Sequence, residues 1–154
     1  MKRITCPWAT VAQTLELLRT GGAAGHEHVV LWLAAASRPE IVAEVYDPEQ
    51  VTARDRFRIP PSGMLALSGR LRADRLRVAA QIHTHPGPAF HSEADNEWAI
   101  VRHVGALSLV LPRFAATTDP DSFLDDAMTY ELSAAGAWLH VPNRGTDARL
   151  EITP

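Results

Sequence analysis

Cysteine and lysine are almost missing from this chain of 154 residues. The single cysteine, Cys6, excludes an internal disulfide and any zinc site built from several cysteines. No stretch approaches the ~18 consecutive apolar residues of a membrane span, and the N-terminus lacks the basic start and apolar block of a signal peptide. We therefore expect a cytoplasmic protein that makes no membrane contact.

A large excess of one charge is also absent. The net charge is only -3, so no general attraction to a polyelectrolyte is expected. Arginines nevertheless concentrate between Arg54 and Arg77, which is interpreted either as a solvated face or as a docking surface for an acidic partner. Aromatic residues that would stack on bases are not interleaved with these arginines, so nucleic acid is not an expected partner.

The length and composition are those of one ordinary globular domain. Hydrophobic residues make up 46% of the chain and charged residues 21%, which is enough apolar surface for a single core. No repeat or linker divides the sequence. We predict a single domain over residues 1–154, in which the polar residues 142–154 form a loose tail.

Helical and strand patterns alternate along the chain. Apolar residues at helical spacing predict helices over 10–19, from Ser62 onward, and from Ser92 to about Gly105. Residues 51–61 are expected to be extended but irregular. Apolar runs of strand length predict strands at 29–33, 41–46, 78–82, 107–111, 127–133 and 138–141. This order favours an α/β fold with a mixed β-sheet flanked by helices.

The chemically informative stretch is His83-Thr84-His85-Pro86, followed by Ser92 and Asp95. Side chains alternate along a strand, so two histidines one residue apart lie on the same face and can approach one metal ion. Asp95 supplies a third ligand if the intervening loop folds back. Three nitrogen and oxygen ligands with a fourth position open to water are typical of a catalytic zinc site.

Ser92-x-x-Asp95 is also a capping-box pattern, which predicts a helix that begins at Ser92. The cap would place Asp95 in the first helical turn and so fix the carboxylate relative to the histidine strand. Hydrolysis further requires a base, and Glu27 is the preferred candidate because it precedes the first apolar strand. Glu44 and Glu93 remain alternatives on sequence grounds.

Taken together, His83-x-His85-Pro86, Ser92-x-x-Asp95 and Glu27 ahead of Val29-Val30-Leu31-Trp32 resemble the JAMM (JAB/MPN, Mov34) metalloprotease family, and in particular its bacterial JAB-like branch. The resemblance implies a cytidine-deaminase-like architecture and zinc held by His83, His85 and Asp95. It also implies Glu27 as the catalytic base and Ser92 as the catalytic serine. Two departures are a loop before Ser92 that is one residue shorter than the commonest form, and His28 where many members have a small residue.

The resemblance implies an isopeptidase or peptidase that cuts after the C-terminus of a ubiquitin-like or sulfur-carrier protein, with E1- or E2-like conjugation proteins as further partners. In that mechanism Glu27 takes a proton from water and returns it to the departing amine, while Ser92 donates a hydrogen bond to the oxyanion. Lys2 is the only lysine, which suits an enzyme that cuts lysine linkages but equally reflects arginine-rich coding.

Two other functions compete with this interpretation. A non-catalytic MPN-type interaction module would keep the fold without turnover. A deaminase-like zinc hydrolase is disfavoured because such sites recruit cysteine pairs. The remaining histidines receive weaker assignments: His91 either supports the ligands from outside or is a solvated loop residue, and no role is assigned to His103 or His140.

Overall fold

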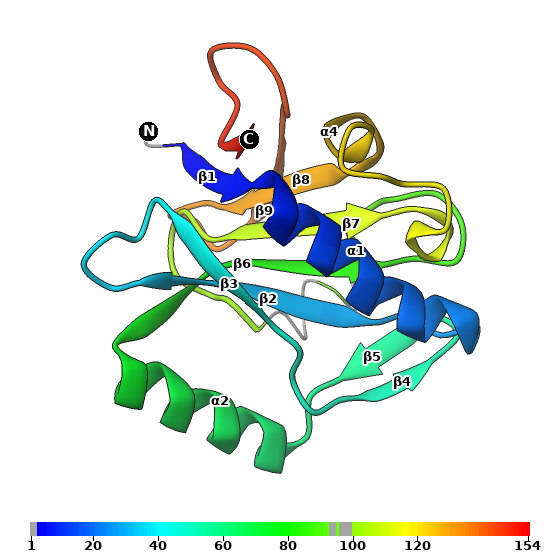
Figure 1. Cartoon of the computed structure of the whole chain (residues 1–154), viewed down its shortest axis with the longest axis horizontal. Helices are drawn as coiled ribbons and strands as arrows, with labels where there is room; N and C mark the ends of the chain where they lie inside the picture. The colour runs from blue at the N-terminus through cyan, green and yellow to red at the C-terminus, as the bar shows by residue number, and fades with distance from the viewer. Residues whose placement is uncertain (1–2, 93–94, 96–99) are drawn as a thin grey trace.

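A six-stranded mixed sheet forms the centre of the computed structural model, which describes residues 3–92, 95 and 100–154 (Figure 1). Its strand order is β3-β2-β6-β7-β8-β9. The bounds are β2 (Val29–Ala35), β3 (Val42–Tyr46), β6 (Leu76–Thr84), β7 (Leu107–Leu111), β8 (Met128–Leu132) and β9 (Trp138–Val141). Strands β6 and β7 run parallel and the other neighbours antiparallel, so the predicted mixed sheet is confirmed.

The apolar runs of the sequence occupy the middle of this sheet. All residues of β7 are buried, as are all but the last of β2, which is what strands covered on both faces require. The first predicted hairpin, β2 with β3, and the last, β8 with β9, are both present. Strand β7 also pairs parallel to β6, as the predicted strand–helix–strand passage requires of its two strands.

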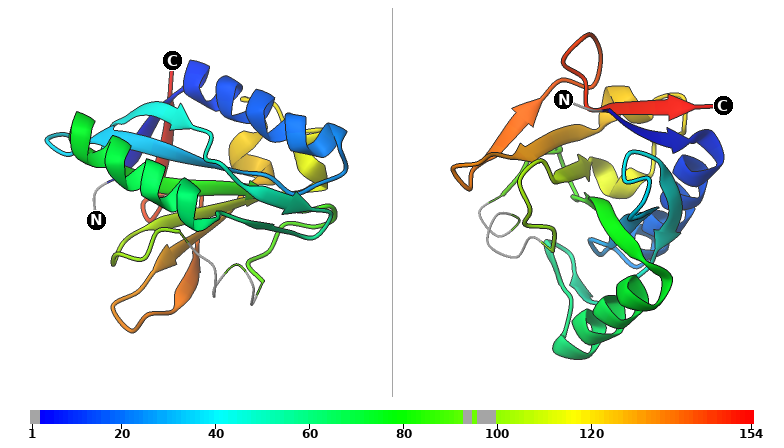
Figure 2. Two further views of the ribbon diagram at one scale, coloured as in Figure 1. Left: turned by 90° about the horizontal axis from the view of Figure 1, so that it is seen from below. Right: turned by 90° about the vertical axis from the view of Figure 1, so that its left-hand side faces the viewer.

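Two helices cover opposite faces of the sheet (Figure 2). Helix α1 (Trp8–Ala23) is longer than predicted and packs Val11, Leu15 and Leu18 into the main apolar cluster. Helix α2 (Pro61–Asp74) packs Leu67 against alternate residues of β2 on the other face. The prediction that Ser62 caps α2 is wrong, because Pro60 is the cap residue and the Ser62 hydroxyl donates instead to the Glu49 carboxylate.

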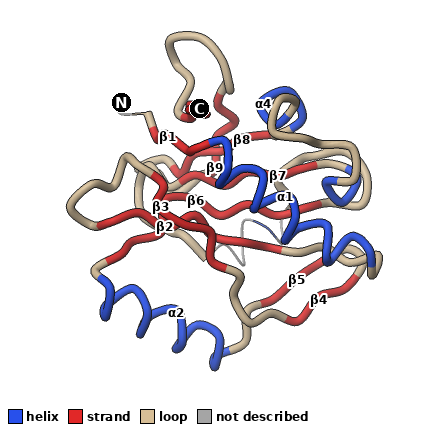
Figure 3. The backbone as a smooth tube through the Cα atoms, viewed as in Figure 1, coloured by secondary structure: helices blue, strands red, loops and turns tan. Residues whose placement is uncertain are grey.

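Residues 51–61 are more regular than the sequence predicts. Strands β4 (Val51–Ala53) and β5 (Arg56–Arg58) form an antiparallel hairpin set apart from the large sheet (Figure 3). The backbone N–H of Glu27 donates to the carbonyl of Ala53 at 2.8 Å, so the hairpin lies against the entry to β2. This contact brings the hairpin to the same end of the sheet as the C-terminus of β6.

The chain ends meet in a second small sheet. Strands β1 (Ile4–Pro7) and β10 (Leu150–Thr153) pair in parallel, and Leu150 is buried. The predicted loose tail over 142–154 is therefore wrong in its last residues, which the polar composition of the segment concealed. A short 3₁₀ turn, η1 (Arg113–Ala115), and helix α4 (Phe123–Asp126) complete the described elements.

The helix predicted from Ser92 lies mostly outside the described residues, which exclude 93–94 and 96–99. Asp95 is helical, but 100–105 are not, so the predicted helix end near Gly105 is wrong. The backbone N–H groups of Ile100 and Val101 bond to the Gln81 side chain instead. Among the described helices, none is both long and apolar enough to cross a membrane.

Candidate metal centre

Strand β6 delivers the two histidines to one point at its C-terminal end. His83 is in the strand, His85 follows it directly, and both side chains are buried. Their Nε2 atoms lie 3.3 Å apart and the ring centroids 5.1 Å apart. The side-chain alternation that the sequence predicts thus holds through the strand end, and both imidazoles face the same point.

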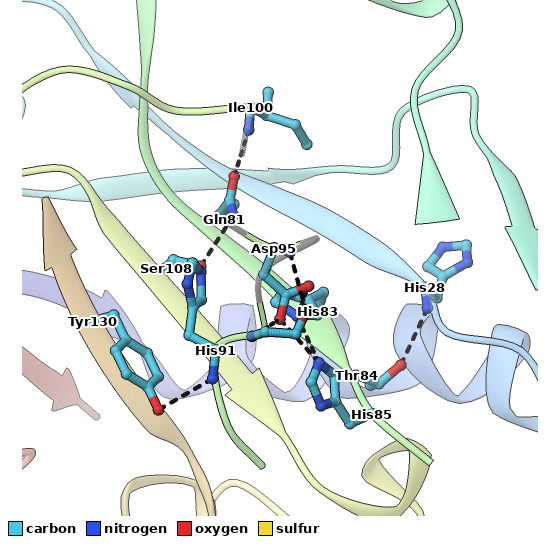
Figure 4. A network of polar contacts seen from close by, with 11 residues as sticks. His28, Gln81, His83, Thr84, His85, His91, Asp95, Ile100, Ser108 and Tyr130 are labelled. Atoms are coloured by element: carbon cyan, nitrogen blue, oxygen red, sulfur yellow. Dashed lines mark hydrogen bonds and ion pairs between the residues drawn. The ribbon is translucent and has the colours of Figure 1, made fainter. Parts of the chain in front are cut away.

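Asp95 reaches this point through the predicted capping box. The Ser92 N–H donates to Asp95 Oδ2 at 2.8 Å, and the Asp95 N–H donates to Ser92 Oγ at 3.1 Å. The two carboxylate oxygens then face one histidine each: Oδ1 lies 3.1 Å from His83 Nε2 and Oδ2 3.1 Å from His85 Nε2 (Figure 4). Helix initiation and ligand placement are therefore the same local structure.

Charge in the cluster favours a cation. Burial alone would raise the pKa of Asp95, but hydrogen bonds from His83 and His85 outweigh it and hold that pKa well below its usual range. Burial alone would likewise lower the pKa of His85, whereas its hydrogen bond to Asp95 and the negative charge of Asp95 and Glu27 raise it. A metal ion that takes the place of the histidine protons must compete with them, so binding is expected to release protons.

The spacing of the ligand atoms fits one metal ion. Ligand atoms placed about 2.0–2.1 Å from an ion at tetrahedral angles lie roughly 3.3 Å from one another. The two Nε2 atoms are 3.3 Å apart, and each lies 3.1 Å from one oxygen of Asp95, Oδ1 for His83 and Oδ2 for His85. One ligand atom from each residue lies within 4.8 Å of the other two. These three residues form a buried group with metal-binding capacity in the described part of the chain, and three ligands leave a fourth coordination position for water or substrate.

Glu27 lies beside the cluster, in the turn between α1 and β2. It is buried, with 4% of its surface exposed. Burial is the main cause that raises the pKa of its carboxyl to about 7; Asp95 and Asp55 raise it further, and His85 opposes the shift. A carboxyl with this pKa can both accept and release a proton near neutral pH.

A cavity of about 170 Å³ connects these groups. Its lining residues come from the turn before β2, the β4–β5 hairpin and the loop after β6: Glu27, Asp55, His85, Pro86, Gly87, Pro88, Phe90 and Ser92. Glu27 and Ser92 therefore face a common space that reaches the ligand His85. A second hollow of about 430 Å³ runs along the hairpin and includes Asp95 in its lining.

Other residues singled out in the sequence lie elsewhere. Glu44, the alternative base, pairs with Arg70, and Glu93 and Trp98 lie outside the described residues. The remaining histidines bond away from the ligands: His26 to Thr52, His28 to Asp47, and His103 to Arg77, while His140 packs near Tyr130. Cys6 is buried, which raises its pKa to about 12 and leaves a protonated, unreactive thiol.

Sequence reasoning missed the polar residues that support the site. Gln50 bonds through its side-chain amide to both the N–H and the carbonyl of Val29 and so acts as a strand partner for the start of β2. Gln81 and Ser108 are buried on the strands beside the ligands. No local motif marks these residues. For Gln81 and Ser108 the available signal was a polar side chain inside an apolar strand run, which demands a buried partner, whereas Gln50 lies in a polar stretch that gives no such signal.

No protein-family profile matches the chain. Among curated proteins it is 32% identical over 158 residues to the "probable metalloprotease y4jG" of Sinorhizobium fredii, a match that covers 99% of this chain and 96% of that protein. Solved structures share its fold at low identity. Protein DSY2949 of Desulfitobacterium hafniense gives a TM-score of 0.66 at 15% identity, covering 97% of this chain and 92% of that one. The JAB1/MPN domain protein AF2198 of Archaeoglobus fulgidus gives 0.53 at 12%, covering 100% of both chains.

The near full-length likeness to a metalloprotease and the JAB1/MPN fold agree with the residues gathered at the end of β6. They also agree with the architecture, an α/β fold with helices on both faces of a mixed sheet. The chain belongs to the JAMM (JAB/MPN/Mov34) metalloprotease family.

Proposed function

We propose that the protein is a zinc-dependent JAMM-type isopeptidase or peptidase that cuts after the C-terminal tail of a ubiquitin-like or sulfur-carrier protein. The observation that carries the proposal is the meeting of three buried ligands, His83, His85 and Asp95, with a carboxyl of pKa about 7 at one cavity. Nitrogen and oxygen ligands in this number and spacing suit zinc with an open position. When bound, zinc would polarise the scissile carbonyl and lower the pKa of a bound water toward ~7.

Glu27 is the proposed general base. Its buried carboxyl has a pKa of about 7, close to the pH at which a cytoplasmic enzyme works, so it can take a proton from water and pass it to the departing amine nitrogen. The hydrogen bond from its own N–H to Ala53 fixes the backbone at this position. Proton transfer by a positioned group of this kind contributes roughly 10²- to 10⁴-fold to a rate.

Ser92 is the proposed oxyanion donor. Its Oγ accepts the Asp95 N–H, which orients the hydroxyl at the helix start, and the residue lines the cavity that holds Glu27. A hydroxyl proton directed into that cavity can bond to the oxygen that gains negative charge during attack on a carbonyl. Such a donor contributes about 3 kcal/mol of transition-state stabilisation in comparable sites.

The β4–β5 hairpin supports the choice of an extended tail as substrate. In the described part of the chain β4 and β5 pair only with each other, so a hairpin edge can receive a further strand. The hollow along this hairpin includes Phe57 and reaches Asp95. A peptide lying there in extended form would bring its scissile bond to the metal ligands.

The wider setting belongs to the same proposal. A ubiquitin-like or sulfur-carrier substrate would place E1- or E2-like conjugation proteins among the partners, and a cytoplasmic location is predicted from the sequence. The arginine-rich stretch from Arg54 to Arg77 remains a candidate docking surface. Arg70 of this stretch already pairs with Glu44 and Asp74 of its own chain, so the docking role would rest mainly on its neighbours.

The deciding assay incubates the zinc-loaded protein with fusions in which a ubiquitin-like or sulfur-carrier domain is followed by a lysine-linked or peptide-linked reporter. We expect cleavage after the tail, loss of cleavage with a chelator, and recovery on adding zinc. Glu27→Gln is the matched control and should retain zinc while turnover falls roughly 10²- to 10⁴-fold. Cleavage that ignores chelation would contradict the proposal, and a fully active Glu27→Gln protein would show that the base is misassigned.

The same assay separates the alternative, a non-catalytic MPN-type interaction module. Such a module would bind the fusion protein without cutting it, with or without stoichiometric zinc. The acidic base candidate and the three ligands are all present and grouped in this chain, which supports the catalytic function.

A further inference from the structure

A chain of buried polar groups runs beside the metal centre and is not part of the ligand set (Figure 4). Gln81 and His83 alternate onto the same face of β6, and Ser108 lies on β7 in register with Gln81. Gln81 and Ser108 are buried, with 1% and 0% of their surface exposed. Polar groups without water must bond to protein, so their partners define what they hold in place.

The Gln81 amide has a fixed orientation. Its Oε1 lies 2.9 Å from the N–H of Ile100 and 3.4 Å from that of Val101, and both backbone groups can only donate. The oxygen is therefore the acceptor on this side and Nε2 points the other way, to donate to Ser108 Oγ at 3.0 Å. One side chain thus joins the start of the segment 100–105 to strand β7.

Ser108 links Gln81 to His91 through hydrogen bonds. The Ser108 oxygen accepts from Gln81, and His91 Nε2 lies 3.0 Å from it on the other side. This contact joins the two side chains whichever of them donates, because a hydroxyl can both donate and accept. The His91 ring also packs against Tyr130 and Trp138, at centroid distances of 4.9 and 5.1 Å, and the backbone N–H of His91 donates to Tyr130 Oη at 3.2 Å.

The two anchored ends enclose the residues that complete the site. His91 directly precedes Ser92, and Ile100 follows Asp95. We infer that the chain Ile100/Val101–Gln81–Ser108–His91 fixes both ends of the segment that carries Ser92 and Asp95, so that Gln81, Ser108 and His91 are positioning residues for the third metal ligand. The inference rests on the proposed function for its catalytic consequence, but not for its effect on metal binding.

Strand β6 supports both parts of the metal site. Strand β6 carries His83 as a ligand and Gln81 as an anchor, so the ligand pair and the segment that supplies Asp95 share one rigid support. If the connection is cut, the segment that carries Asp95 loses this anchoring, and Asp95 keeps only its contacts with Ser92, His83 and His85 among the described residues. Outer partners that orient metal ligands typically alter metal affinity or activity by 10- to 100-fold when they are removed.

The test uses three variants of the full chain. Ser108→Ala removes the bridging hydroxyl, and His91→Phe keeps an aromatic ring against Tyr130 and Trp138 but lacks the nitrogen that contacts Ser108. The control is Thr129→Val, which removes a buried hydroxyl from β8 that bonds to Asn143 and lies outside the chain of contacts. Gln81 is left intact because its removal would strand two backbone N–H groups.

Zinc affinity is measured by competition with a chelating dye, and cobalt substitution reports the ligand geometry through the visible absorption spectrum. We expect Ser108→Ala and His91→Phe each to weaken zinc binding about 10- to 100-fold and to alter the cobalt spectrum. In zinc-saturated protein, kcat should fall about tenfold while KM stays within twofold. Thr129→Val should lower the thermal midpoint to a similar degree yet keep the zinc affinity and cobalt spectrum of the unmodified protein.

The double variant Ser108→Ala/His91→Phe sharpens the test. Both substitutions break the same contact, the one between Ser108 Oγ and His91 Nε2, so their effects on zinc affinity should not add. The combined loss is expected to be within threefold of the larger single loss. The inference is overturned if both single variants bind zinc like the unmodified protein, if their losses multiply, or if Thr129→Val loses as much zinc affinity as they do. Thermal midpoints identify a variant that fails to fold, and the other single variant then decides.

The inference and the proposed function can fail separately. An unmodified protein that binds zinc tightly but cuts none of the fusions would contradict the isopeptidase proposal alone, since the zinc and cobalt measurements need no substrate. An active protein whose Ser108→Ala and His91→Phe variants retain full zinc affinity would contradict the inference alone.

Discussion

The two faces of the central sheet differ in chemistry although the same strands build both. On the α1 face, β6 and β7 contribute apolar side chains such as Ile82 and Leu109 to the main cluster. On the other face the same strands carry Gln81, His83 and Ser108, which are buried and polar, beside apolar residues such as Val110. Because side chains alternate along a strand, neighbouring residues lie on opposite faces, one in the apolar core and the next beside the metal site.

This difference separates stability from function along single strands. Apolar side chains on the α1 face contribute free energy of folding through removal from water and close packing. The buried polar groups on the other face contribute little net folding free energy, because their hydrogen bonds replace bonds to water. Their role lies in the direction in which they hold the groups of the metal site. Substitutions on one face should therefore change the free energy of unfolding, and substitutions on the other should change metal binding.

The strongest expected effect lies on the polar face. Asp95→Asn preserves side-chain size but removes the charge that faces His83 and His85, so zinc affinity should fall by roughly 10³-fold or more, about 4 kcal/mol. Competition with a chelating dye measures it. Asp125→Asn removes an exposed acid that pairs with Arg144 and should leave zinc affinity unchanged. Less than a tenfold loss for Asp95→Asn would mean that this carboxylate is not a ligand.

On the apolar face, Leu109→Ala should lower the free energy of unfolding by about 3 kcal/mol, because it leaves a cavity in the main cluster. Urea unfolding of the metal-free protein measures the loss, and zinc affinity of the folded variant should stay within twofold. Leu139→Ala, at a side chain on β9 that is 55% exposed, is the control and should cost less than about 0.5 kcal/mol. A tenfold change in zinc affinity for Leu109→Ala would break the separation of the two faces.

The raised pKa of Glu27 predicts a pH-dependent change in the free energy of unfolding. Its folded-state pKa of about 7 exceeds that of the unfolded chain, so folding favours the protonated form. The stability that the protonated Glu27 carboxyl allows is full at pH values below the unfolded pKa, and this contribution is lost as pH rises through about 7. Glu27→Gln should therefore stabilise the metal-free protein by an amount on the order of 2 kcal/mol at pH 8 and by almost nothing near pH 4.

Urea unfolding at several pH values checks this expectation. Glu16→Gln, at an exposed position on α1, controls for the loss of a carboxylate as such. A difference between Glu27→Gln and the unmodified protein that stays constant from pH 4 to pH 8 would show that burial does not perturb the Glu27 carboxyl.

The smallest expected effect concerns the contact between α1 and the turn that carries Glu27. A Cβ at Gly21 would lie 2.6 Å from the Cβ of His28 and 3.2 Å from the carbonyl of His26, so Gly21→Ala must displace that turn. We expect a net loss of about 1 kcal/mol in unfolding free energy, after a gain in helix propensity of similar size, and a lower kcat.

Gly69→Ala on α2 is the matched control, since a Cβ there meets nothing within 4 Å. It should raise the free energy of unfolding by about 0.5–1 kcal/mol without a change in kcat. Equal thermal midpoints for the Gly21→Ala and Gly69→Ala proteins would show that the turn adapts to a Cβ at no cost.

What the sequence could predict was local. The strands at 29–33 and 107–111 follow from continuous apolar runs, and the meeting of His83 with His85 follows from alternation along β6. The capping box likewise depends on contacts within a few residues, and it places Asp95 as expected. In each case the deciding interaction is encoded by neighbours in sequence.

What it could not predict depends on distant partners. Gln81 lies inside an apolar run, and its partners Ser108 and Ile100 become visible only when β7 pairs with β6. The wrong helix end near Gly105 has the same origin, because Gln81 takes the backbone N–H groups that a helix would have used. Leu150 was assigned to a loose tail because its burial depends on β1, at the other end of the chain.

That pairing of β1 with β10 bears on how the protein matures during translation. Strand β1 is made long before β10, and Ile4 and Cys6 find their partners Leu150 and Ile152 only after β10 has left the ribosome. Until then β1 has Glu40 and Ile41 as strand neighbours, through two hydrogen bonds from Thr5 to the Glu40 carbonyl and one isolated bridge. The nascent protein would therefore carry the metal-ligating residues on the six-stranded sheet while β1, which lies outside that sheet, still has an open edge of the kind that chaperones shield.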